Sequence, residues 1–168
     1  ILKKLKITDK GCYCCPTPCG KYGHAKTRIG EAFVEGPEYE TIYAMGSNCM
    51  VDDLATITKA NYLCNELGMD TITVGNLLGF AMELNEKGLW DSGLQFGHKE
   101  NISAILDDIA HRRGIGTDLA EGVKFVSEKY GGQEFAAHVK GLEIAAYEPR
   151  ASVGHGLGYA TASRGACH

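Results

Sequence analysis

The sequence predicts a mainly α-helical, multi-helical domain with short extended segments, and two observations support this prediction. Apolar residues recur at steps of three and four along four separate stretches, which is the spacing of one face of an α-helix. A glycine follows each stretch, at the position where a residue of left-handed conformation commonly ends a helix. The four stretches end at Gly68, Gly88, Gly114 and Gly131.

The four helices are expected to follow one another along the chain. The first should begin at Asp52 and Asp53, whose carboxylates can accept hydrogen bonds from the free N–H groups of a first turn. The other three are expected over residues 74–87, 101–113 and 118–130. The inward-facing residues of the four helices are predicted to be Leu54, Ile57, Leu63, Leu67, Leu77, Leu78, Phe80, Ala81, Leu84, Ile102, Ile105, Leu106, Ile109, Leu119, Val123 and Val126.

Loops are expected where glycine and proline gather. One runs from about Gly11 to Gly23, and another lies around residues 35–40. A short extended stretch is expected over residues 137–147. From Glu148 the composition shifts to Gly, Ala and Ser, so we expect residues 1–147 to form one helical domain and residues 148–168 to begin a second region at the edge of an active site.

The overall composition is that of an ordinary globular protein, with 44% hydrophobic and 23% charged residues. The net charge of -4 argues against a nucleic-acid-binding surface, which is normally basic. No apolar run approaches the roughly 20 residues that span a bilayer, and the start of the chain does not read as a secretory signal. Neither nucleic acid nor membrane is therefore an expected partner. Because the chain begins at Ile1 and ends inside a glycine-rich stretch, we expect a fragment cut at both ends.

Seven cysteines are many for 168 residues, and four of them fall within eight positions. The clustered cysteines are Cys12, Cys14, Cys15 and Cys19, and the scattered ones are Cys49, Cys64 and Cys167. An odd count and an ample apolar core argue against a secreted disulfide scaffold. A reducing, cytoplasmic location with a thiolate metal site fits this pattern better.

The spacing Cys12-x-x-Cys15-x-x-x-Cys19 places three thiolates within reach of one metal centre. Thiolates are soft ligands that suit iron–sulfur clusters and zinc, and a four-cysteine cluster would need one further ligand from elsewhere. The residue after the last cysteine is Gly20, whereas a bacterial ferredoxin run has proline there. Zinc, or cysteines with a purely structural role, remain alternatives, and Cys14 is expected to be a spare thiol.

Four segments, taken together, resemble the aldehyde:ferredoxin oxidoreductase family. They are GCYCCPTPC at residues 11–19, GPEYET at 36–41, LCNELGMDTIT at 63–73, and the run from Glu148-Pro-Arg150 to the final GLGYATASRGACH. Their order and spacing match the family across nearly the whole chain. The resemblance implies the multi-helical fold of the C-terminal domains of these enzymes, and a chain that is the middle third of one of them.

The resemblance also implies a chemistry. In this family tungsten, or sometimes molybdenum, is held by two pterins whose phosphates share a Mg²⁺ ion, and an aldehyde is oxidised to a carboxylic acid. Electrons then pass through a 4Fe-4S cluster to ferredoxin or to an iron–sulfur electron-transfer subunit. Cys12, Cys15 and Cys19 match three ligands of that cluster, and the fourth would come from the rest of the enzyme. This segment alone is expected to be inactive.

The resemblance assigns the pterin site to the segment from Asn65 to Asp70, with Asn65, Gly68, Met69 and Asp70 as binding residues. Asn65 departs from the aspartate of the family, and an amide offers one carbonyl acceptor and adds a donor. Asn65 could instead be an ordinary polar residue of a last helical turn, and Gly68 a helix terminator. Arg150 and Arg164 are candidates for the pterin phosphates, because the guanidinium fork suits phosphate oxygens; ordinary surface charge is their alternative.

Glu38, Glu40 and His168 are the candidate acid–base groups. Proton transfer at a carbonyl needs a side chain whose proton affinity suits the working pH. The resemblance matches Glu40 to the active-site glutamate of the family and His168 to its histidine, whereas Glu38 could be a solvated loop carboxylate. Two further functions remain open: a related reductase of aromatic acyl-CoA thioesters, and a non-catalytic metal or electron-transfer module built on the cysteines alone.

Overall fold

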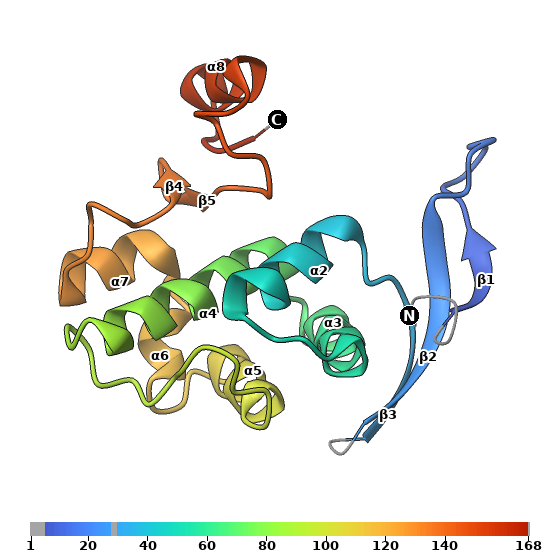
Figure 1. Cartoon of the computed structure of the whole chain (residues 1–168), viewed down its shortest axis with the longest axis horizontal. Coiled ribbons are helices and arrows are strands. Elements are labelled where there is room, and N and C mark those ends of the chain that lie inside the picture. The colour runs from blue at the N-terminus through green and yellow to red at the C-terminus, as the bar shows by residue number, and fades with distance from the viewer. Residues whose placement is uncertain (1–5, 28–29, 168) are drawn as a thin grey trace.

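The computed structural model describes residues 6–27 and 30–167. Helices form the central body, a three-stranded sheet lies on one side of it, and a small hairpin followed by a last helix lies on another side (Figure 1). The prediction of a mainly helical fold with short extended segments is confirmed. None of the described helices combines the length and the hydropathy that a membrane crossing requires.

The helices of the described ranges have the following bounds. They are α2 (Tyr39–Met45), the 3₁₀ helix η1 (Ser47–Cys49), α3 (Leu54–Leu67), α4 (Thr71–Glu86), α5 (Ile102–Ala110), α6 (Gly116–Leu119), α7 (Gly122–Tyr130) and α8 (Val153–Thr161).

Helix α3 begins and ends where the sequence predicts. The Asp53 side chain accepts hydrogen bonds from the Ala55 N–H at 3.3 Å and from the Thr56 hydroxyl at 2.6 Å. At the other end Gly68 adopts a left-handed φ of 70°, and the Met69 N–H donates to the Cys64 carbonyl at 2.8 Å. Glycine suits this position because the conformation strains residues that carry a Cβ.

Three of the expected helices differ from their predicted bounds. Helix α5 ends at Ala110, short of the predicted Arg113, and Arg112 has a left-handed φ of 52°. Helix α4 begins at Thr71, earlier than predicted, because the Asp70 side chain accepts the Thr73 N–H at 2.8 Å and caps the first turn. The prediction of a single helix over residues 118–130 was wrong. Two helices, α6 and α7, occupy this stretch, and Gly122, the first residue of α7, has a φ of +86°. An α-helix cannot continue through that left-handed conformation.

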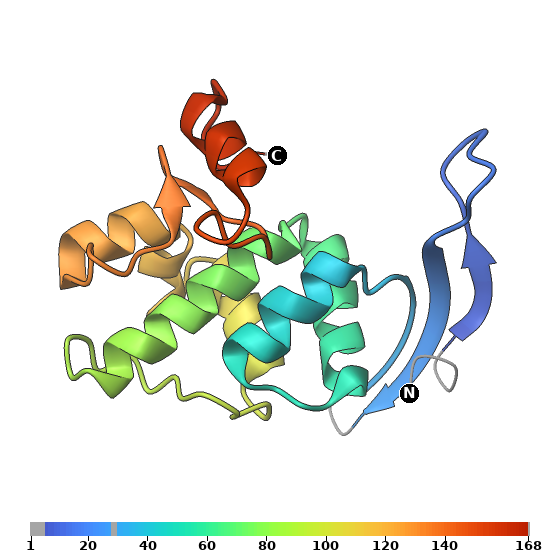
Figure 2. The same cartoon turned by 45° about the horizontal axis from the view of Figure 1, so that its top comes forward.

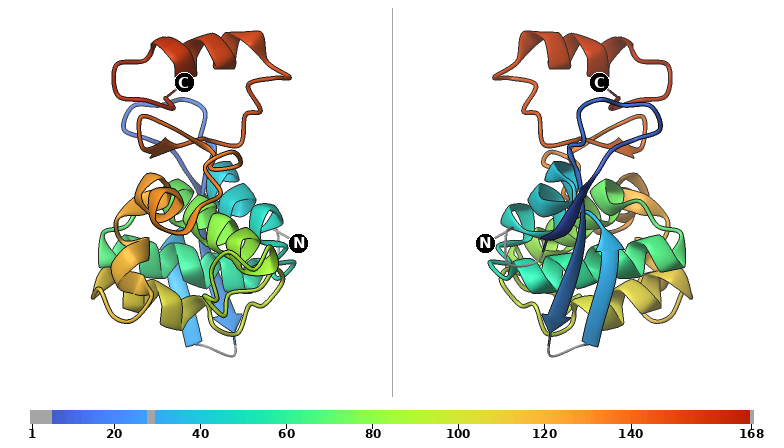
Figure 3. Two further views of the ribbon diagram at one scale, coloured as in Figure 1. Left: turned by 90° about the vertical axis from the view of Figure 1, so that its left-hand side faces the viewer. Right: turned by 90° about the vertical axis from the view of Figure 1, so that its right-hand side faces the viewer.

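The first part of the chain forms a sheet that the sequence did not predict. Strands β1 (Lys6–Lys10), β2 (Gly20–Thr27) and β3 (Gly30–Glu35) pair in antiparallel order β1-β2-β3. The expected loop from Gly11 to Gly23 was therefore too long, because β2 begins at Gly20. Ala25, Ala32 and Val34 are buried, and the sheet packs on α3 (Figure 3). The glycines and charges of these strands hide the usual apolar alternation.

Helix α4 is the most buried element of the body, and α2, η1, α7 and β5 all pack on it. Every predicted inward residue from Leu77 to Val126 is buried, as is Ile57, whereas Leu54, Leu63 and Leu67 are half-buried. Gly75 lets α2 approach closely, because a Cβ added there would lie 2.5 Å from the Ala44 carbonyl carbon. Figure 2 shows α2 lying alongside α4.

The segment expected to be extended contains two very short strands. β4 (His138–Val139) and β5 (Leu142–Glu143) form a hairpin, and its two turn residues, Lys140 and Gly141, have φ values of 56° and 89°. Two positive φ angles are typical of the tight turns that join such strands. The glycine-rich region from Glu148 contains helix α8, which packs through Tyr159. A division of the chain after residue 147 stays a prediction.

Replacing glycine by alanine should have opposite effects in α4 and α8. Gly75→Ala should destabilise the fold by about 1–3 kcal/mol, because the new methyl group meets the Ala44 backbone. Gly154→Ala should stabilise it by about 0.4–1 kcal/mol, because no described atom lies within 4 Å of the added Cβ and alanine restricts the unfolded chain. Urea unfolding of both variants and the parent protein measures the difference. Equal midpoints for the two variants would contradict the packing of α2 on α4.

Candidate functional site

A cavity of about 450 Å³ opens where the end of α3, the start of α4 and the segment before α2 meet. Its volume falls in the roughly 300–1,000 Å³ range of small-molecule and cofactor sites. The residues that line it are Glu35, Glu38, Glu40, Thr41, Asn61, Asn65, Met69, Asp70, Thr71 and Ile72. The structure therefore brings together both candidate glutamates and most of the predicted pterin segment, which are about 30 positions apart in the sequence.

Glu40 holds the least satisfied polar group of this cavity. It lies in the first turn of α2, and its Oε2 accepts a hydrogen bond from the Ala146 N–H at 2.8 Å. Its Oε1 is buried and has no hydrogen-bond partner among the described residues. A buried carboxylate oxygen without a partner costs free energy, so this atom is suited to a donor group that binds in the cavity.

Two phenols lie in the electrostatic field of Glu40. Burial raises the pKa of Tyr43 and of Tyr159, and the negative charge of Glu40 raises both further. Both phenols therefore keep their protons near neutral pH. The Tyr159 hydroxyl donates to the Tyr147 carbonyl at 3.2 Å, which ties α8 to the chain beside Glu40.

The segment from Asn65 to Asp70 has a structural role that accounts for part of its sequence. A Cβ on Gly68 would meet no described atom within 4 Å, so the left-handed helix end explains this glycine without a close approach by a ligand. Asp70 uses Oδ2 to cap α4. The side chains of Asn65 and Asp70 are exposed, and each can offer an oxygen acceptor to a molecule in the cavity.

The clustered cysteines lie in the loop that joins β1 to β2 and extends beyond the helical body (Figure 1). All four are free and exposed, and the Cys15 N–H donates to the Cys12 carbonyl at 3.0 Å in a tight turn. Within the described ranges no three His, Cys, Asp or Glu side chains surround one point as metal ligands do. The three predicted ligands are therefore close together in the sequence, and all three are exposed to solvent.

Strands β1 and β2 form a hairpin whose connecting loop carries the clustered cysteines, and the base of this hairpin lies beside the cavity. A Cβ on Gly20 would lie 3.5 Å from Glu38 Oε1 and 3.6 Å from Glu35 Oε1, two carboxylates that line the cavity. Lys10, at the end of β1, holds Glu35 through a 2.5 Å ion pair. Cys19 directly precedes Gly20, so the cysteine loop ends next to the site that contains Glu40.

The two predicted arginines lie outside the residues that line this cavity. Arg150 binds both oxygens of Glu148, at 2.7 and 2.9 Å, and this pairing lowers the pKa of the Glu148 carboxyl to about 2. Arg164 donates to Cys167 Sγ at 2.6 Å. His168, the predicted catalytic histidine, lies outside the described residues.

Sequence reasoning missed several parts of the site. Asn61 donates to the Glu35 carbonyl at 2.9 Å, and the hydroxyls of Thr41 and Thr71 bond at 2.8 Å across α2 and α4. The Ala146 N–H that holds Glu40 is a backbone group, and nothing in its side chain marks it. These contacts form only when distant segments meet.

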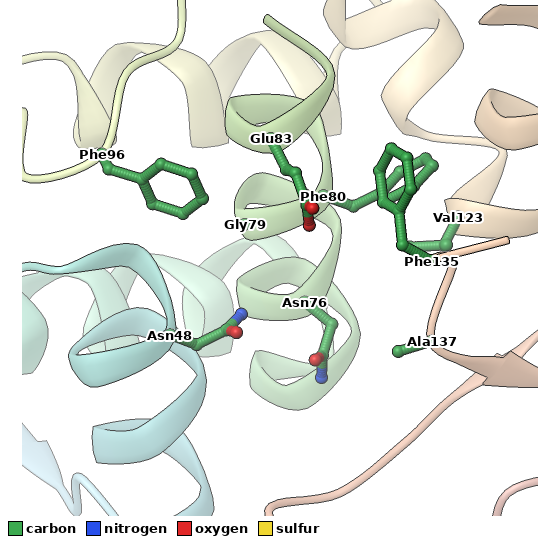
Figure 4. A pocket seen from close by; sticks show the side chains of 9 residues that line it. All are labelled: Asn48, Asn76, Gly79, Phe80, Glu83, Phe96, Val123, Phe135 and Ala137. Atoms are coloured by element: carbon green, nitrogen blue, oxygen red, sulfur yellow. The ribbon is translucent and has the colours of Figure 1, made fainter. Parts of the chain in front are cut away.

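Further cavities adjoin α4, and two of them are larger than a single water molecule. One of about 340 Å³ shares Met69 and Asp70 with the first cavity and is also lined by Glu143. The other, of about 90 Å³, is lined by Asn48, Asn76 and several aromatic rings (Figure 4). Both of these amides already donate to backbone carbonyls, so the small cavity offers few unpaired polar groups.

Comparison with known proteins identifies the family. Residues 1–168 match the family model described as aldehyde ferredoxin oxidoreductase, domains 2 and 3. This chain belongs to that family. The resemblance seen in the sequence is thereby confirmed, and so is the fold class that it implies. The family is one of oxidoreductase enzymes.

Curated relatives support the assignment. The chain is 46% identical to the tungsten-containing aldehyde ferredoxin oxidoreductase of Pyrococcus furiosus over 172 residues, which is 98% of this chain and 28% of that protein. The enzyme of the same name from Thermococcus kodakarensis gives the same identity and coverage. Identity falls to 33% with the aliphatic sulfonate oxidoreductase, WOR-like subunit, of P. furiosus, over 93% of this chain and 27% of that one.

A solved structure shares the fold. The active-site complex BamBC of benzoyl coenzyme A reductase superimposes with a TM-score of 0.73 at 25% identity, over 97% of this chain and 25% of that chain. The present chain therefore spans between a quarter and a third of the length of the relatives it matches.

Alkylation should separate the cysteines into two classes. Burial raises the pKa of the Cys49 and Cys64 thiols to about 12, so at about pH 8 both stay protonated and inaccessible. Iodoacetamide should then modify the four hairpin cysteines of the metal-free folded protein and leave Cys49 and Cys64 intact until denaturant is added. Peptide mass spectrometry measures each site. Modification of Cys64 in the folded protein at the rate of the hairpin thiols would contradict this assignment.

Proposed function

We propose that this chain is part of a tungsten-pterin oxidoreductase that oxidises aldehydes to carboxylic acids and passes the electrons to ferredoxin. The observation that carries the proposal is the buried Glu40 oxygen without a partner, in a cavity whose wall is the segment from Asn65 to Asp70. The names of the relatives at 46% identity favour tungsten over molybdenum as the metal.

The cavity fits a pterin on chemical grounds. Pterin rings carry amino and N–H donors, and Asn65 and Asp70 offer oxygen acceptors on one wall, whereas Glu40 offers a buried carboxylate on another. When bound, the tungsten centre would supply the two-electron oxidation of the aldehyde. Glu40 would hold or accept a proton at Oε1 beside the substrate, since its Oε2 is already fixed by the Ala146 N–H.

The cysteine loop fits an iron–sulfur cluster by the chemistry of its donors. Cys12, Cys15 and Cys19 are free, exposed thiols in one short loop whose base adjoins the cavity. A 4Fe-4S cluster would complete its ligands with a further cysteine from the rest of the enzyme. The three thiolates would hold the cluster, and the cluster would supply the electron path to ferredoxin or to an iron–sulfur electron-transfer subunit.

The remaining sites are proposed from the family resemblance. Arg150 and Arg164 would contact the oxygens of the pterin phosphates, a Mg²⁺ ion would be held by the phosphates themselves, and His168 would face the substrate. For Arg150 this requires the phosphate to share or displace Glu148, which now occupies the guanidinium fork.

The same fold occurs in a complex that acts on another substrate class. The matched benzoyl coenzyme A reductase is 25% identical, against 46% for the aldehyde enzymes. This difference favours an aldehyde substrate over an aromatic acyl-CoA thioester. A non-catalytic module built on the cysteines alone would give no role to the cavity that contains Glu38 and Glu40.

The proposal is tested on the complete enzyme of which this chain would be a part. Purified without oxygen, it should contain tungsten, pterin and iron, and should reduce a viologen dye when an aldehyde is added. Iron or zinc without tungsten and pterin would instead support the non-catalytic module. Dye oxidation dependent on an aromatic acyl-CoA, with no response to aldehydes, would move the assignment to the reductase.

In the same assay Glu40→Gln should lower kcat by at least about a hundredfold, because an amide cannot accept the proton. Tungsten and iron contents should stay those of the parent enzyme. Glu86→Gln is the matched control, since this exposed carboxylate lies near the far end of α4 and outside the cavity. An unchanged kcat in Glu40→Gln would remove Glu40 from the mechanism.

Replacing single hairpin cysteines should separate ligands from the spare thiol. Cys12→Ala, Cys15→Ala or Cys19→Ala in the complete enzyme should each lower the iron content and the electron-paramagnetic signal of the reduced cluster, because each removes one thiolate ligand. Cys14→Ala should retain both. A Cys14→Ala enzyme that lost its iron as fully as the others would show that the ligand set is different.

A further inference from the structure

Glu143 is a buried carboxylate that the proposed chemistry does not use. It lies at the end of β5, is only 4% exposed, and has both oxygens engaged. Oε1 accepts the Val123 N–H at 3.0 Å, and Oε2 accepts the Thr73 hydroxyl at 3.1 Å. One side chain therefore joins β5 to the first turns of both α7 and α4. An anion at two helix N-termini is favoured by the partial positive charge there.

The surrounding backbone leaves room for this carboxylate. Gly122 has a φ of +86°, and a Cβ on it would lie 3.3 Å from Glu143 Oε1. A larger residue at that position would be strained by its backbone conformation and would crowd the oxygen. The break between α6 and α7 thus occurs at the point where Glu143 enters.

Glu143 connects to both walls of the candidate site. Thr73, its hydroxyl partner, also donates its backbone N–H to Asp70 Oδ2 at 2.8 Å. Three residues after Glu143, the Ala146 N–H donates to Glu40 Oε2. The chain after β5 passes the N-terminal end of α4 (Figure 2). The residue that anchors this passage is therefore linked to Asp70 on one side and to Glu40 on the other.

We propose that Glu143 is a positioning residue for the site that contains Glu40 and Asp70. Its carboxylate fixes the segment 143–146 between α4 and α7, and thereby sets the Ala146 N–H that orients Glu40. The proposal rests on the function proposed above for the kinetic part of its test. A second tie exists, because Asn76 donates to the Ile144 carbonyl at 3.0 Å, so the test must show that Glu143 is needed in addition.

The first measurement does not depend on activity. Hydrogen–deuterium exchange of the Ala146 amide in the complete protein should be about fivefold to tenfold faster in Glu143→Ala, because the segment loses one anchor. Glu143→Gln should keep exchange near the parent rate, since its amide oxygen can accept the Val123 N–H and its NH₂ can donate to Thr73. Val126→Ala is the matched control: it creates a core defect in the same helix, α7, and leaves both hydrogen bonds of Glu143 in place.

The second measurement is kinetic. Glu143→Ala should lower kcat by about tenfold to a hundredfold with KM within about twofold, because misplacement of a reacting group affects the chemical step. Glu143→Gln should retain most of the kcat of the parent enzyme. Combined with Glu40→Gln, Glu143→Ala should add little further loss, since the group it positions is already gone.

A near-isosteric variant covers the case in which Glu143→Ala does not fold. Thr73→Val removes only the hydroxyl bonded to Glu143 Oε2. It should give a smaller rise in the exchange rate of the Ala146 amide and a smaller loss of kcat than Glu143→Ala. If exchange at Ala146 and kcat in the folded Glu143 or Thr73 variants match those of Val126→Ala, Asn76 alone suffices and the proposal is overturned. If the parent enzyme does not oxidise aldehydes, the proposed function fails, while the exchange comparison still decides the role of Glu143.

Discussion

The buried surface of helix α4 is the constraint on which the rest of the structure depends. Ten of its sixteen residues are buried, and α2, η1, α7 and β5 all contact it. Its residues 74–82 are all buried in succession, so neighbours must cover every face of these central turns. Gly75 and Gly79 let two of these neighbours come close, since added Cβ atoms there would lie 2.5 Å from Ala44 and from the Asn48 amide.

The N-terminal end of α4 collects the polar contacts that hold distant segments together. Asp70 caps it, Thr71 bonds to Thr41 of α2, and Thr73 bonds to Glu143 of β5. The free N–H groups of a first helical turn need acceptors, and the helix dipole favours negative ones. This requirement gathers acidic side chains and the loops that carry them at one end of one helix, which is where the largest of the described cavities lies.

The cavity and the adjoining cysteine loop contain unpaired or exposed groups that selection for stability alone would not favour. Glu40 has one buried oxygen without a partner in the described structure, and the adjoining cysteine loop exposes four thiols. Unpaired buried acceptors lower stability, and exposed thiols are open to oxidation. Both features would become favourable under the proposed function, in which a cofactor with donor groups and a metal cluster occupy these places.

The sequence by itself determined the helical fold class, most of the core and the family. Apolar spacing and glycine stops located α3 and the body of α4, and the hairpin cysteines with the segment from Asn65 to Asp70 carried the resemblance. Only the tertiary structure decided the sheet, the break at Gly122 and the contacts of Glu40 and Glu143. Periodicity reports on one helix face at a time, whereas these features depend on contacts between segments as many as 106 residues apart.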